Sequence, residues 1–515
     1  MKAITAEDMR LLDSRTIQEE GISGERLMKR AGTALACAIM EYIGELSGNG
    51  INVRSMVFLA GKGNNAGDAF VAAKMLFDTH LYQIYLHCMV KEESLSGDAL
   101  TVFREMPSEL KSRIKYSLEK EDLTSCDLII DGLLGTGFRG ELRNDYGKWI
   151  AAANAANCHI VAIDLPSGME ANTGKSASSA IHADLTITMA NPKKGMLTEE
   201  GAALCGRIRV MDIGIPEKFE KEISNFKECT TFSDVKNLFD KEKNNIHKNS
   251  RGHVLILGGC SLYSGAPLLA GESALRAGAG LVSILLPRGT EASGNTPKAL
   301  MIRHISGNKE GFFDSSSIKE ACPVLEKADR LVIGPGMGIH KESLPFLEYI
   351  LQQEKVVVAD ADALNFLAEN ISLFKTKKST LILTPHEGEM KRLEKGFSLD
   401  RCLHREERAK KIAEKSSSYV ILKGNQSIVC TPDGKTAVNL SGSPALATAG
   451  SGDILAGICG AMLKKEEDIF SSLRGAVFLH GLLGEMANPS GSRGVIADDL
   501  LCYIAPAMRK INVKA

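Results

Sequence analysis

Short apolar runs alternate with helical patterns along the first half of the chain. The apolar runs cover residues 55–60, 83–90, 127–134, 159–165 and 184–189, and patterns of helical spacing separate most of them, as at 69–77 and 146–156. Strands that are apolar throughout are typical of a parallel sheet with helices on both faces. The pattern therefore predicts a three-layer α/β/α domain.

The segment before the first predicted strand reads as helical. Its apolar positions between residues 5 and 43 follow a helical stripe that Gly21 to Gly24 interrupts. Thr5 and Asp8 have the spacing of a capping box. We therefore expect a two-part helical segment that begins at Thr5.

The second half repeats the alternation with different motifs. Strands are predicted at 254–257, 281–286, 331–333, 356–359, 381–383 and 420–422. The turn Thr431–Gly434 predicts a hairpin between 427–430 and 435–440. The two halves share no motif, so a tandem duplication is not supported. The second half is predicted to be a further α/β/α domain.

A change of composition separates the halves. Lys and Glu crowd the stretch 216–251, in which Asn244-Asn245 and 249–252 read as loops. We place the boundary near Lys227, which gives domains at 1–226 and 227–515.

Composition narrows the classes of function. The net charge of −1 gives no general attraction to nucleic acid or to acidic membranes. The acidic, amphipathic start is not typical of a signal peptide, and no 18-residue apolar window is present. The 12 cysteines are scattered without a CxxC pair, which is typical of reduced thiols. We expect a cytoplasmic homo-oligomer that acts on small molecules, without nucleic-acid or membrane partners.

A polar, glycine-containing loop follows the first predicted strand. Residues 61–68 read Gly-Lys-Gly-Asn-Asn-Ala-Gly-Asp and open a helix, where free backbone amides favour an anion such as phosphate. The spacing is not that of a Walker A loop. Two interpretations remain, a ligand site or a polar turn with a helix cap. The position at the carboxyl end of a strand favours the site.

Two later strands also end in carboxylates. Asp131 follows one, and Asp164 with Ser167 follows the next. Singly, each Asp could cap a helix, but together with Asn65 and Asp68 they offer oxygen ligands for a cation and a carboxylate for proton transfer. Residues 135–140 formally match GxGxxG, but they follow an internal strand. We interpret this run as a loop that accommodates phosphate and not as evidence of hydride chemistry.

These motifs, in this order behind a two-part helix, resemble the YjeF N-terminal domain, the NAD(P)HX epimerase family, which has a Rossmann-like fold. The resemblance covers residues 5–216 and implies a K⁺ site at Asn65, Asp131 and Ser167, with Asp164 as the catalytic acid/base. It implies substrate contacts at Asn64, Asn65, Ala66, Gly67, Asp68, Gly135, Thr136, Gly137, Phe138, Arg139, Gly140, Glu141, Tyr146 and Asp164. The chain departs from the family at Ala66, commonly Gly, and at Lys29-Arg30, commonly Glu-Asn.

The second half carries a glycine-rich helix start. Residues 449–453 read Ala-Gly-Ser-Gly-Asp, and the apolar positions 454, 455, 458 and 462 fall on one helical face. Free amides at such a helix start can bind a phosphoryl group that is being transferred. Asp453 is placed to take a proton from a hydroxyl group. The alternative interpretation is a glycine turn with an acidic residue favoured by the helix dipole.

Companion motifs at 247–259, 263–281, 333–338, 360–365, 384–390 and 422–427 complete a pattern that resembles the ribokinase-like NAD(P)HX dehydratase family over residues 246–510. The resemblance implies catalysis by Asp453, which touches the substrate, and further substrate contacts at Ala266, Gly336, His386, Glu387, Gly388, Glu389, Met390, Lys391 and Arg392. It implies nucleotide contacts at Lys423, Gly424, Asn425, Gln426, Ser427, Ser443, Ala449, Gly450, Ser451 and Gly452. Ser451 replaces a more frequent Thr. His386 alone could instead be a helix-entry residue, and Asp360 and Asp362 could be strand-end caps.

Together the two resemblances imply a bifunctional enzyme that repairs hydrated NADH and NADPH. One domain would interconvert the R and S forms of NADHX and NADPHX, and the other would dehydrate the S form with ADP (or ATP) as phosphoryl donor and Mg²⁺. Phosphorylation would turn the ring hydroxyl into a good leaving group. The alternatives are a vitamin-precursor kinase with a non-catalytic N-terminal domain and an inactive binding module.

Overall fold

The computed structural model describes residues 1–143, 145–239, 247–291, 296–399, 404–463, 468–488 and 493–512. It forms two compact units, one of Met1–Cys229 and one of Thr230–Asn488 with the C-terminal segment. The assignment of one activity to 1–226 and the other to 227–515 stays a prediction. Asn244-Asn245, predicted as loop, lies outside the described residues.

The first unit is built on a parallel sheet. Its strand order is β4 (Ile114–Lys115), β3 (Gln83–Cys88), β2 (Ser55–Ala60), β5 (Leu128–Gly132), β6 (His159–Ile163), β7 (Leu185–Met189) and β8 (Arg207–Met211). Every neighbouring pair is parallel. The five strands predicted from apolar runs are thus present, whereas β4 and β8 carry alternating or short patterns that gave no such signal. In addition, β1 (Lys2–Ala3) pairs antiparallel with β9 (Lys227–Thr230).

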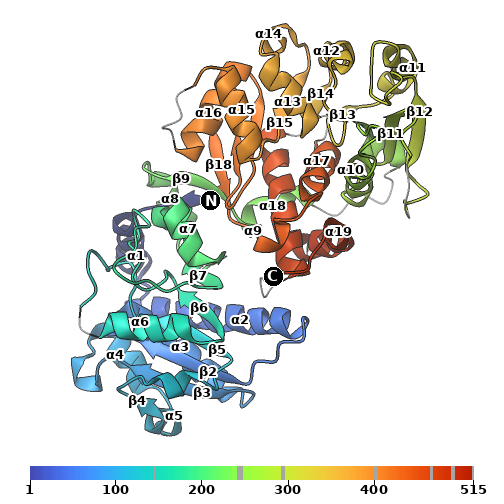
Figure 1. The fold of residues 1–515 in the computed structure, drawn as a ribbon. Coiled ribbons are helices and arrows are strands. Elements are labelled where there is room, and N and C mark those ends of the chain that lie inside the picture. The colour runs from blue at the N-terminus through green and yellow to red at the C-terminus, as the bar shows by residue number, and fades with distance from the viewer. Residues whose placement is uncertain are drawn as a thin grey trace. The chain divides into compact units, whose positions relative to one another are not determined.

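Helices cover both faces of this sheet. On one face, α2 (Gly24–Ser47), α3 (Asn64–Asp78) and α4 (Gly97–Arg104) pack with strand side chains such as Phe58 and Ile130. On the other face, α6 (Tyr146–Ala155) packs on Val57 and Ile129. Figure 1 shows these layers. The remaining helices are α1 (Ala6–Glu20), α5 (Ser108–Ser112), α7 (Glu199–Cys205), α8 (Glu217–Glu222) and the 3-10 turns η1 (Glu92–Ser94), η2 (Lys120–Leu123) and η3 (Lys194–Leu197).

The predicted two-part helix at the N-terminus is confirmed. Thr5 accepts from the amide of Asp8, and the Asp8 carboxylate accepts from the amide of Thr5, which is the predicted capping box. Gly21 ends α1 in the left-handed region with φ 66°, where glycine has no steric cost.

The sheet of the second unit is mixed. Its order is β18 (Thr436–Asn439), β17 (Ile428–Cys430), β16 (Tyr419–Leu422), β15 (Thr380–Leu383), β14 (Val356–Ala359), β13 (Arg330–Ile333), β10 (His253–Leu257), β11 (Leu281–Pro287) and β12 (Met301–Ile305). The strands from β16 to β12 pair in parallel, and the predicted hairpin adds β17 and β18 antiparallel. The edge strand β12 was not predicted because its exposed positions interrupt the apolar pattern.

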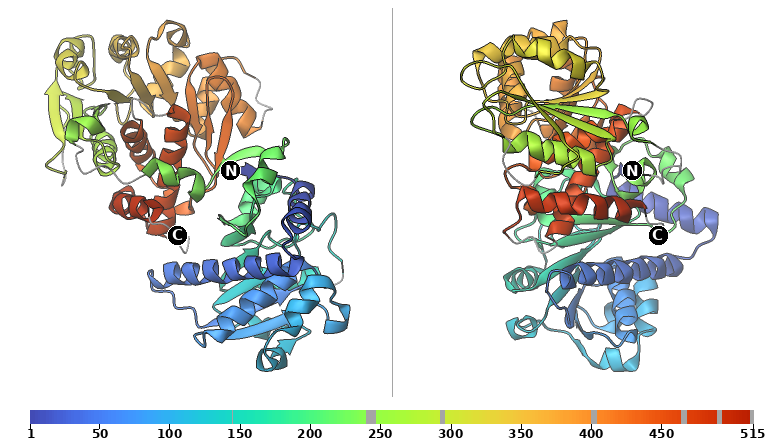
Figure 2. Two further views of the ribbon diagram at one scale, coloured as in Figure 1. Left: turned by 180° about the vertical axis from the view of Figure 1, so that it is seen from behind. Right: turned by 90° about the vertical axis from the view of Figure 1, so that its right-hand side faces the viewer.

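Two helical layers flank this sheet. One layer consists of α10 (Gly265–Arg276), α17 (Ser451–Met462), α18 (Ile469–Ala487) and α19 (Ala497–Asn512), which form one core with the sheet. These helices stay together on one side of the strands in both views of Figure 2. The other helices are α11 (Ser317–Leu325), α12 (Leu344–Leu351), α13 (Asp362–Glu369), α14 (Leu373–Thr376), α15 (Glu387–Gly396) and α16 (Arg405–Ser416). The short segments α9 (Phe232–Val235), η4 (Lys236–Phe239), η5 (Lys248–Arg251), η6 (Lys341–Ser343) and η7 (Pro444–Leu446) complete the unit. The predicted α/β class, with two units each built on a sheet flanked by helices, is confirmed.

Helix α17 differs from its prediction in one respect. The sequence pattern predicts one apolar face, but every residue from Ile454 to Met462 is buried. Small residues on the opposite face explain this, because a Cβ on Gly457 would run into the carbonyl oxygen of Ala270 in α10. The helix is thus enclosed on all sides, and its N-terminus is held firmly in place. Within the described part of the chain, no helix is long and apolar enough to cross a membrane.

Candidate active sites

Asp164 directly follows β6 and takes a strained backbone conformation. Its φ of 62° lies in the left-handed region, which is uncommon for a residue other than glycine and occurs often at functional sites. Its Oδ1 accepts from the hydroxyl of Thr188 at 2.9 Å and from the amide of Met189 at 3.2 Å. The backbone therefore aims this carboxylate at the ends of β6 and β7.

Lys193 completes the surroundings of Asp164. Its side chain is only 1% exposed, and its ammonium forms an ion pair with Asp164 Oδ1. It also donates to Thr188 Oγ1 at 3.0 Å and to the carbonyl of Met189 at 3.3 Å. All three of its protons are used, so one carboxylate oxygen of Asp164 is saturated by protein donors.

The start of α3 lies against the ends of β5 and β6. Asn65 donates from Nδ2 to the carbonyls of Leu134 at 2.9 Å and Ile163 at 2.8 Å. Gly135 faces it, since a Cβ there would lie 2.7 Å from Asn65 Oδ1. The loop at Gly135 therefore lies directly against the start of α3, and the position excludes any side chain on Gly135.

The other two residues of the predicted K⁺ site are adjacent to each other. Ser167 donates to both oxygens of Asp131, from its hydroxyl at 2.6 Å and from its amide at 2.8 Å. The same hydroxyl accepts from the amide of Leu134 at 2.8 Å. Burial raises the pKa of the Asp131 carboxyl to about 6, although the bonds from Ser167 oppose this. Asn65, Asp131 and Ser167 thus meet around Leu134 and present amide, carboxylate and hydroxyl oxygens, which suit a hard cation.

Two further carboxyls lie in the electrostatic surroundings of Asp164. Asp68, on the first turns of α3, is buried, and burial together with Asp164 and Asp13 raises its pKa well above the ordinary value. Burial also raises the pKa of Asp13 on α1 to about 6, with Lys193 opposing and Asp164 adding to the shift. The site therefore holds three carboxyls around one lysine.

The predicted substrate loop 135–141 is largely exposed and borders a small pocket. The pocket lies between this loop and residues 170–173, and its lining includes Thr136, Phe138 and Arg139. Arg139 pairs with Glu7, and the amide of Gly140 donates to Glu170 at 3.0 Å. Tyr146 lies elsewhere, because its ring belongs to the hydrophobic cluster beneath α6.

The departures from the family pattern are accommodated. Ala66 is fully buried within α3. Lys29 pairs with Glu25 at 2.7 Å and with Glu105 at 2.8 Å, and Arg30 donates to the carbonyl of Ile213 at 3.5 Å. Both basic residues are therefore held by partners within the first unit.

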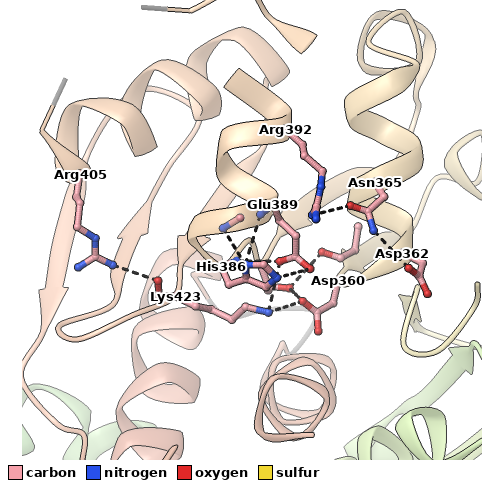
Figure 3. A network of polar contacts seen from close by, with 11 residues as sticks. Asp360, Asp362, Asn365, His386, Glu389, Arg392, Arg405 and Lys423 are labelled. Atoms are coloured by element: carbon pink, nitrogen blue, oxygen red, sulfur yellow. Dashed lines mark hydrogen bonds and ion pairs between the residues drawn. The ribbon is translucent and has the colours of Figure 1, made fainter. Parts of the chain in front are cut away.

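The second unit has a buried polar network at the ends of β14, β15 and β16. Figure 3 shows Lys423, which follows β16, reaching Asp360, which follows β14, with an Nζ–Oδ1 distance of 2.7 Å. Thr384, after β15, donates to the same Oδ1 at 2.7 Å. Burial lowers the pKa of the Lys423 ammonium, but Asp360 and Glu389 outweigh it and raise that pKa overall. Lys423 is therefore held as a cation.

His386 is the helix-entry residue of α15, as one of its two interpretations proposed. Its Nδ1 accepts from the amide of Gly388 at 2.9 Å, and its own amide donates to Glu389 Oε2 at 2.8 Å. Glu389 is buried, and burial, which Asp360 reinforces and Lys423 opposes, raises its pKa to about 7. The cap leaves Nε2 of His386 near Glu389 Oε1, at 3.4 Å, as Figure 3 shows from close by.

The other residues of the predicted run 386–392 differ in exposure. Met390 is fully buried in the core, and Glu387 is engaged by Arg405 at 2.9 Å and Arg408 at 2.8 Å. Lys391 is exposed, and Arg392 donates to Asn365 at 3.0 Å. Within this run, His386, Lys391 and Arg392 therefore offer a ligand the most accessible side chains.

The start of α17 lies beside Lys423. Gly450 begins the helix with φ 88°, and no side chain caps it among the described residues. A Cβ on Gly452 would lie 3.2 Å from Lys423 Nζ and 3.7 Å from Asp360 Oδ2. Burial, with Asp360 adding and Lys423 opposing, raises the pKa of Asp453 to about 7. Uncapped amides, a cation and a carboxyl with a near-neutral pKa thus meet here, which suits phosphoryl transfer to a hydroxyl.

His480 of α18 supports this helix start from below. Its Nε2 lies 2.9 Å from the carbonyl oxygen of Ser451, and burial lowers its pKa to about 4, so the ring is neutral and donates. The Ser451 hydroxyl donates to the carbonyl of Leu446 at 2.7 Å. Ser443 caps η7 through the amide of Ala445 at 3.1 Å. The predicted nucleotide residues 443–452 therefore form a braced loop and helix start.

The predicted nucleotide loop at 423–427 is held by Arg405. This guanidinium donates to the carbonyls of Lys423 at 3.1 Å and Asn425 at 2.7 Å, and its Nε donates to Glu387. Gly424 is required beside it, because its φ is 149° and a Cβ would lie 2.5 Å from Arg405 Nη2. One arginine therefore ties the nucleotide loop to the start of α15.

Ala266, in the first turn of α10, and Gly336, which follows β13, are neighbours. A Cβ on Gly336 would lie 3.3 Å from the Cβ of Ala266 and 3.0 Å from the carbonyl of Tyr263. Asp360, directly after β14, accepts from Thr384 and Lys423, and Asp362 accepts from the amide of Gly338 at 2.9 Å. Among the described residues, no group of three or more His, Cys, Asp or Glu is arranged to hold a metal ion.

Several residues of the two sites were not predicted from the sequence to be functional. Lys193, Thr188 and Asp13 belong to the first, and Arg405 and Thr384 belong to the second. A signal existed for Lys193, which follows the fifth predicted strand in the run Asn-Pro-Lys, and for Thr384, which follows another predicted strand. Arg405 gave none, because its role depends on loops that are distant in sequence.

Comparison with known proteins agrees with this architecture. Residues 254–506 match the family model described as NAD(P)H-hydrate dehydratase, and residues 24–195 match that of the YjeF-related protein N-terminus. A protein of Moorella thermoacetica, named bifunctional NAD(P)H-hydrate repair enzyme Nnr, is 33% identical over 523 residues, which cover 99% of this chain and 97% of that protein. The enzyme of the same name from Coxiella burnetii is 31% identical and covers 94% and 95%.

A solved structure is also similar to part of the chain. The ADP/ATP-dependent NAD(P)H-hydrate dehydratase of Bacillus subtilis, crystallised with ATP and Mg²⁺, is 26% identical with a TM-score of 0.43. The match covers 56% of this chain and all of that chain (100%).

The folds and sites define an enzyme of two α/β units, of which the second has a mixed sheet. The full-length relatives make the family specific: the chain belongs to the bifunctional NAD(P)H-hydrate repair enzymes. The expected resemblance is confirmed over both units, including its isomerase and lyase character. The full-length match also favours this family over a vitamin-precursor kinase with an added binding domain.

Proposed function

We propose that this chain repairs NADHX and NADPHX, with epimerisation in the first unit and nucleotide-dependent dehydration of the S form in the second. The observation that carries the proposal is the meeting of Lys423, Asp360 and Asp453 at the uncapped start of α17. Such a site stabilises a transferring phosphoryl group and removes a proton from the accepting hydroxyl.

In the second unit the substrate hydroxyl would lie at Asp453. The Asp453 carboxylate takes the hydroxyl proton while the oxygen accepts the terminal phosphoryl group of the nucleotide. The amides of Gly452 and Asp453 and the ammonium of Lys423 stabilise the negative charge on that group. The phosphate ester then leaves with the electron pair of its C–O bond, and the lone pair of the ring nitrogen supports its departure. Loss of a ring proton restores NAD(P)H.

The nucleotide would lie along 423–427 and 443–452, with the hydrated ring directed to Ala266, Gly336 and His386. The ties from Arg405 to the first of these loops support this arrangement. ADP and ATP are both candidates for the donor. Mg²⁺ would accompany the nucleotide phosphates, which supply most of its ligands.

In the first unit, Asp164 would be the acid/base residue, and the loops 64–68 and 135–141 would hold the dinucleotide. Asn65, Asp131 and Ser167 would hold K⁺, because Asn65 and Ser167 both contact the backbone of Leu134 and Ser167 is bonded to Asp131. The cation would supply a fixed positive charge near the pyrophosphate. Epimerisation complements dehydration, since spontaneous hydration yields both epimers and the second unit takes one. Homo-oligomeric assembly and a cytoplasmic location stay predictions.

The donor and the dehydration are tested together on the purified full-length chain. The S epimer of NADHX is incubated with ADP, with ATP or with a non-hydrolysable analogue, and reduced nicotinamide is followed by its near-ultraviolet absorbance. Recovery with ADP or ATP but not with the analogue is expected, together with release of one inorganic phosphate for each NADH. No recovery with any donor, or a stable phosphorylated product, would overturn the proposal for the second unit.

A further inference from the structure

Asp68 is a buried carboxyl without a hydrogen-bond partner among the residues that the structure describes. Its side chain is 8% exposed, and within the described part of the chain no donor lies in hydrogen-bond reach of its oxygens. A buried polar group left unpaired costs free energy, so such a group at a site usually meets a ligand. This carboxyl is therefore free to bind a substrate.

The position of Asp68 brings it to Asp164. Asn65 ties the first turn of α3 to the carbonyl of Ile163, the residue just before Asp164. Asp68 lies three residues further along the same helix, which places it on the same helical face. The electrostatic effect of Asp164 on the Asp68 carboxyl shows that the two groups share one environment.

The charges around the two carboxyls are unequal. Lys193 makes its ion pair with Asp164, and within the described residues no cation pairs with Asp68. Asp13 adds a further negative neighbour from α1. Two neighbouring carboxyls with one ammonium cannot both stay ionised at little cost, and the unpaired one keeps its proton. Lys193 therefore compensates the charge of Asp164, whereas burial together with Asp164 and Asp13 raises the pKa of Asp68, which favours Asp68 as the proton donor of the pair.

The second oxygen of Asp164 is available for chemistry. Thr188, Met189 and Lys193 all donate to Oδ1, and no donor within the described residues reaches Oδ2. Lys193 therefore positions the carboxylate by one oxygen and leaves the other free. The site presents one acid and one base, each with an unengaged oxygen.

We propose that Asp68 and Asp164 are the acid and the base of the epimerisation, which proceeds by loss and re-addition of water. This inference rests on the proposed epimerase function of the first unit. Asp68 protonates the ring hydroxyl, the C–O bond breaks with its electron pair on oxygen, and water leaves. The ring nitrogen supplies its lone pair, which gives a C=N⁺ double bond.

The second half of the reaction restores the substrate in the other configuration. A water molecule attacks the same carbon from the opposite face, and its extra proton passes to the Asp164 carboxylate. The electron pair of the C=N⁺ bond returns to nitrogen. At the end Asp68 has lost its proton and Asp164 has gained one. The site can then run the reaction in the reverse direction, or the two residues can return to their first state by exchanging protons with solvent. Each epimerisation therefore replaces the hydroxyl oxygen by one from water.

A competing route breaks the ring instead. If a single base removed the hydroxyl proton, the bond from carbon to ring nitrogen would open to an aldehyde and close again on the other face. That route keeps the original oxygen and needs no carboxylic acid at Asp68. The fate of the oxygen thus separates the two mechanisms.

The test uses the full-length chain and pure R epimer in water enriched in oxygen-18, without nucleotide. The S epimer formed at early times is separated, and its molecular mass is measured by mass spectrometry. A sample without enzyme corrects for spontaneous exchange of the hydroxyl oxygen with water. We expect one oxygen-18 in each S molecule formed. Retention of oxygen-16 during enzymatic epimerisation would overturn the inference.

Variants assign the acid. Asp68→Asn should lower kcat for R-to-S conversion about 100-fold or more, the range for a lost general acid, with a smaller change in KM. Asp78→Asn, at the exposed end of the same helix, should leave the rate unchanged. S-epimer dehydration by the second unit, measured in the same preparations, should stay at the wild-type rate.

The outcomes distinguish the inference from the function on which it rests. A wild-type chain that does not epimerise would refute the proposed function of the first unit. A wild-type chain that epimerises while Asp68→Asn keeps more than about a tenth of its rate would refute the role of Asp68 alone. Unfolding of Asp68→Asn is checked by its melting curve, and the oxygen-18 result on the wild type stands independently of any variant.

Discussion

Lys423 and Asp360 form an ion pair of 2.7 Å that lies directly beside the start of α17 (Figure 3). The exposed fractions of the two side chains are 17% and 2%. Because Gly452 has no side chain, the ammonium comes close to the helix amides, and a Cβ there would lie 3.2 Å from Nζ. The pair therefore places one fixed positive charge where the phosphoryl group would be transferred.

Removal of one partner should destabilise the second unit. Asp360→Asn leaves the ammonium of Lys423 without its main counter-charge, which should cost about 3 kcal/mol, as for other buried pairs that are broken. Lys423→Met added to this variant should recover part of the loss, because no unpaired charge remains. Denaturant titration followed by circular dichroism, which does not depend on activity, measures both. The exposed pair of Lys74 and Asp78 is the control, and its removal should cost less than about 1 kcal/mol. Equal losses at both pairs would contradict the account.

Asp453 should make dehydration depend on pH. Its pKa of about 7 means that the carboxylate needed as base is lost as pH falls below neutrality. The kcat of S-epimer dehydration should therefore fall about tenfold per pH unit below 7 and level off above it. Asp453→Asn should lower kcat about 100-fold or more at every pH. A flat profile between pH 5 and 8 would exclude this carboxylate as the base.

The same residue should weaken the fold at high pH. The pKa of Asp453 is about 7 in the folded state, against an ordinary value of 3.8. Below pH 4 the carboxyl is protonated in both the folded and the unfolded state and costs no stability. As pH rises to 7 the unfolded state loses its proton more readily, so the free energy of unfolding falls. Asp453→Asn should therefore stabilise the second unit at pH 8 by on the order of 2 to 4 kcal/mol, with no gain at pH 4. Denaturant titration at the two pH values measures the difference.

The regular elements of this fold were largely predictable, and the reason is local. Residues 55–60 and 356–359 were predicted to the residue because every position in β2 and almost every position in β14 is buried, which makes the apolar run and the strand coincide. Strand β8 was missed because its burial is partial and arginines alternate with apolar residues. Local patterns thus located the strands whose two faces are both covered.

The sites were predictable only where a residue ends a strand or starts a helix. Asp164 and Asp453 satisfy that rule. Lys193 acts through a tight loop in which Ala190 has φ 56° and which pairs with Ile4, far away in sequence. Arg405 likewise acts on carbonyls some 20 residues away, at Asn425. Such contacts depend on tertiary closure, which no local pattern records.

Arg405 should control binding of the nucleotide. Arg405→Lys keeps the positive charge but loses the planar guanidinium group, whose two terminal nitrogens donate to the carbonyls of Lys423 and Asn425. The conformation of the loop 423–427 should therefore be less well fixed. The KM for the nucleotide should rise about tenfold, a loss of about 1.4 kcal/mol, with a smaller change in the KM for the S epimer. Arg276→Lys, on the exposed side of α10, is the matched control. An unchanged nucleotide KM would remove Arg405 from this role.

The most direct test follows an equal mixture of R- and S-NADHX with ADP or ATP present and compares three forms of the full-length chain. The account predicts that the wild type restores all of the mixture to NADH. Asp164→Asn should restore only the S half at the enzymatic rate, and Asp453→Asn should restore almost none. Full recovery by Asp164→Asn at the wild-type rate, or no recovery by the wild type, would contradict the division of the repair between the two units.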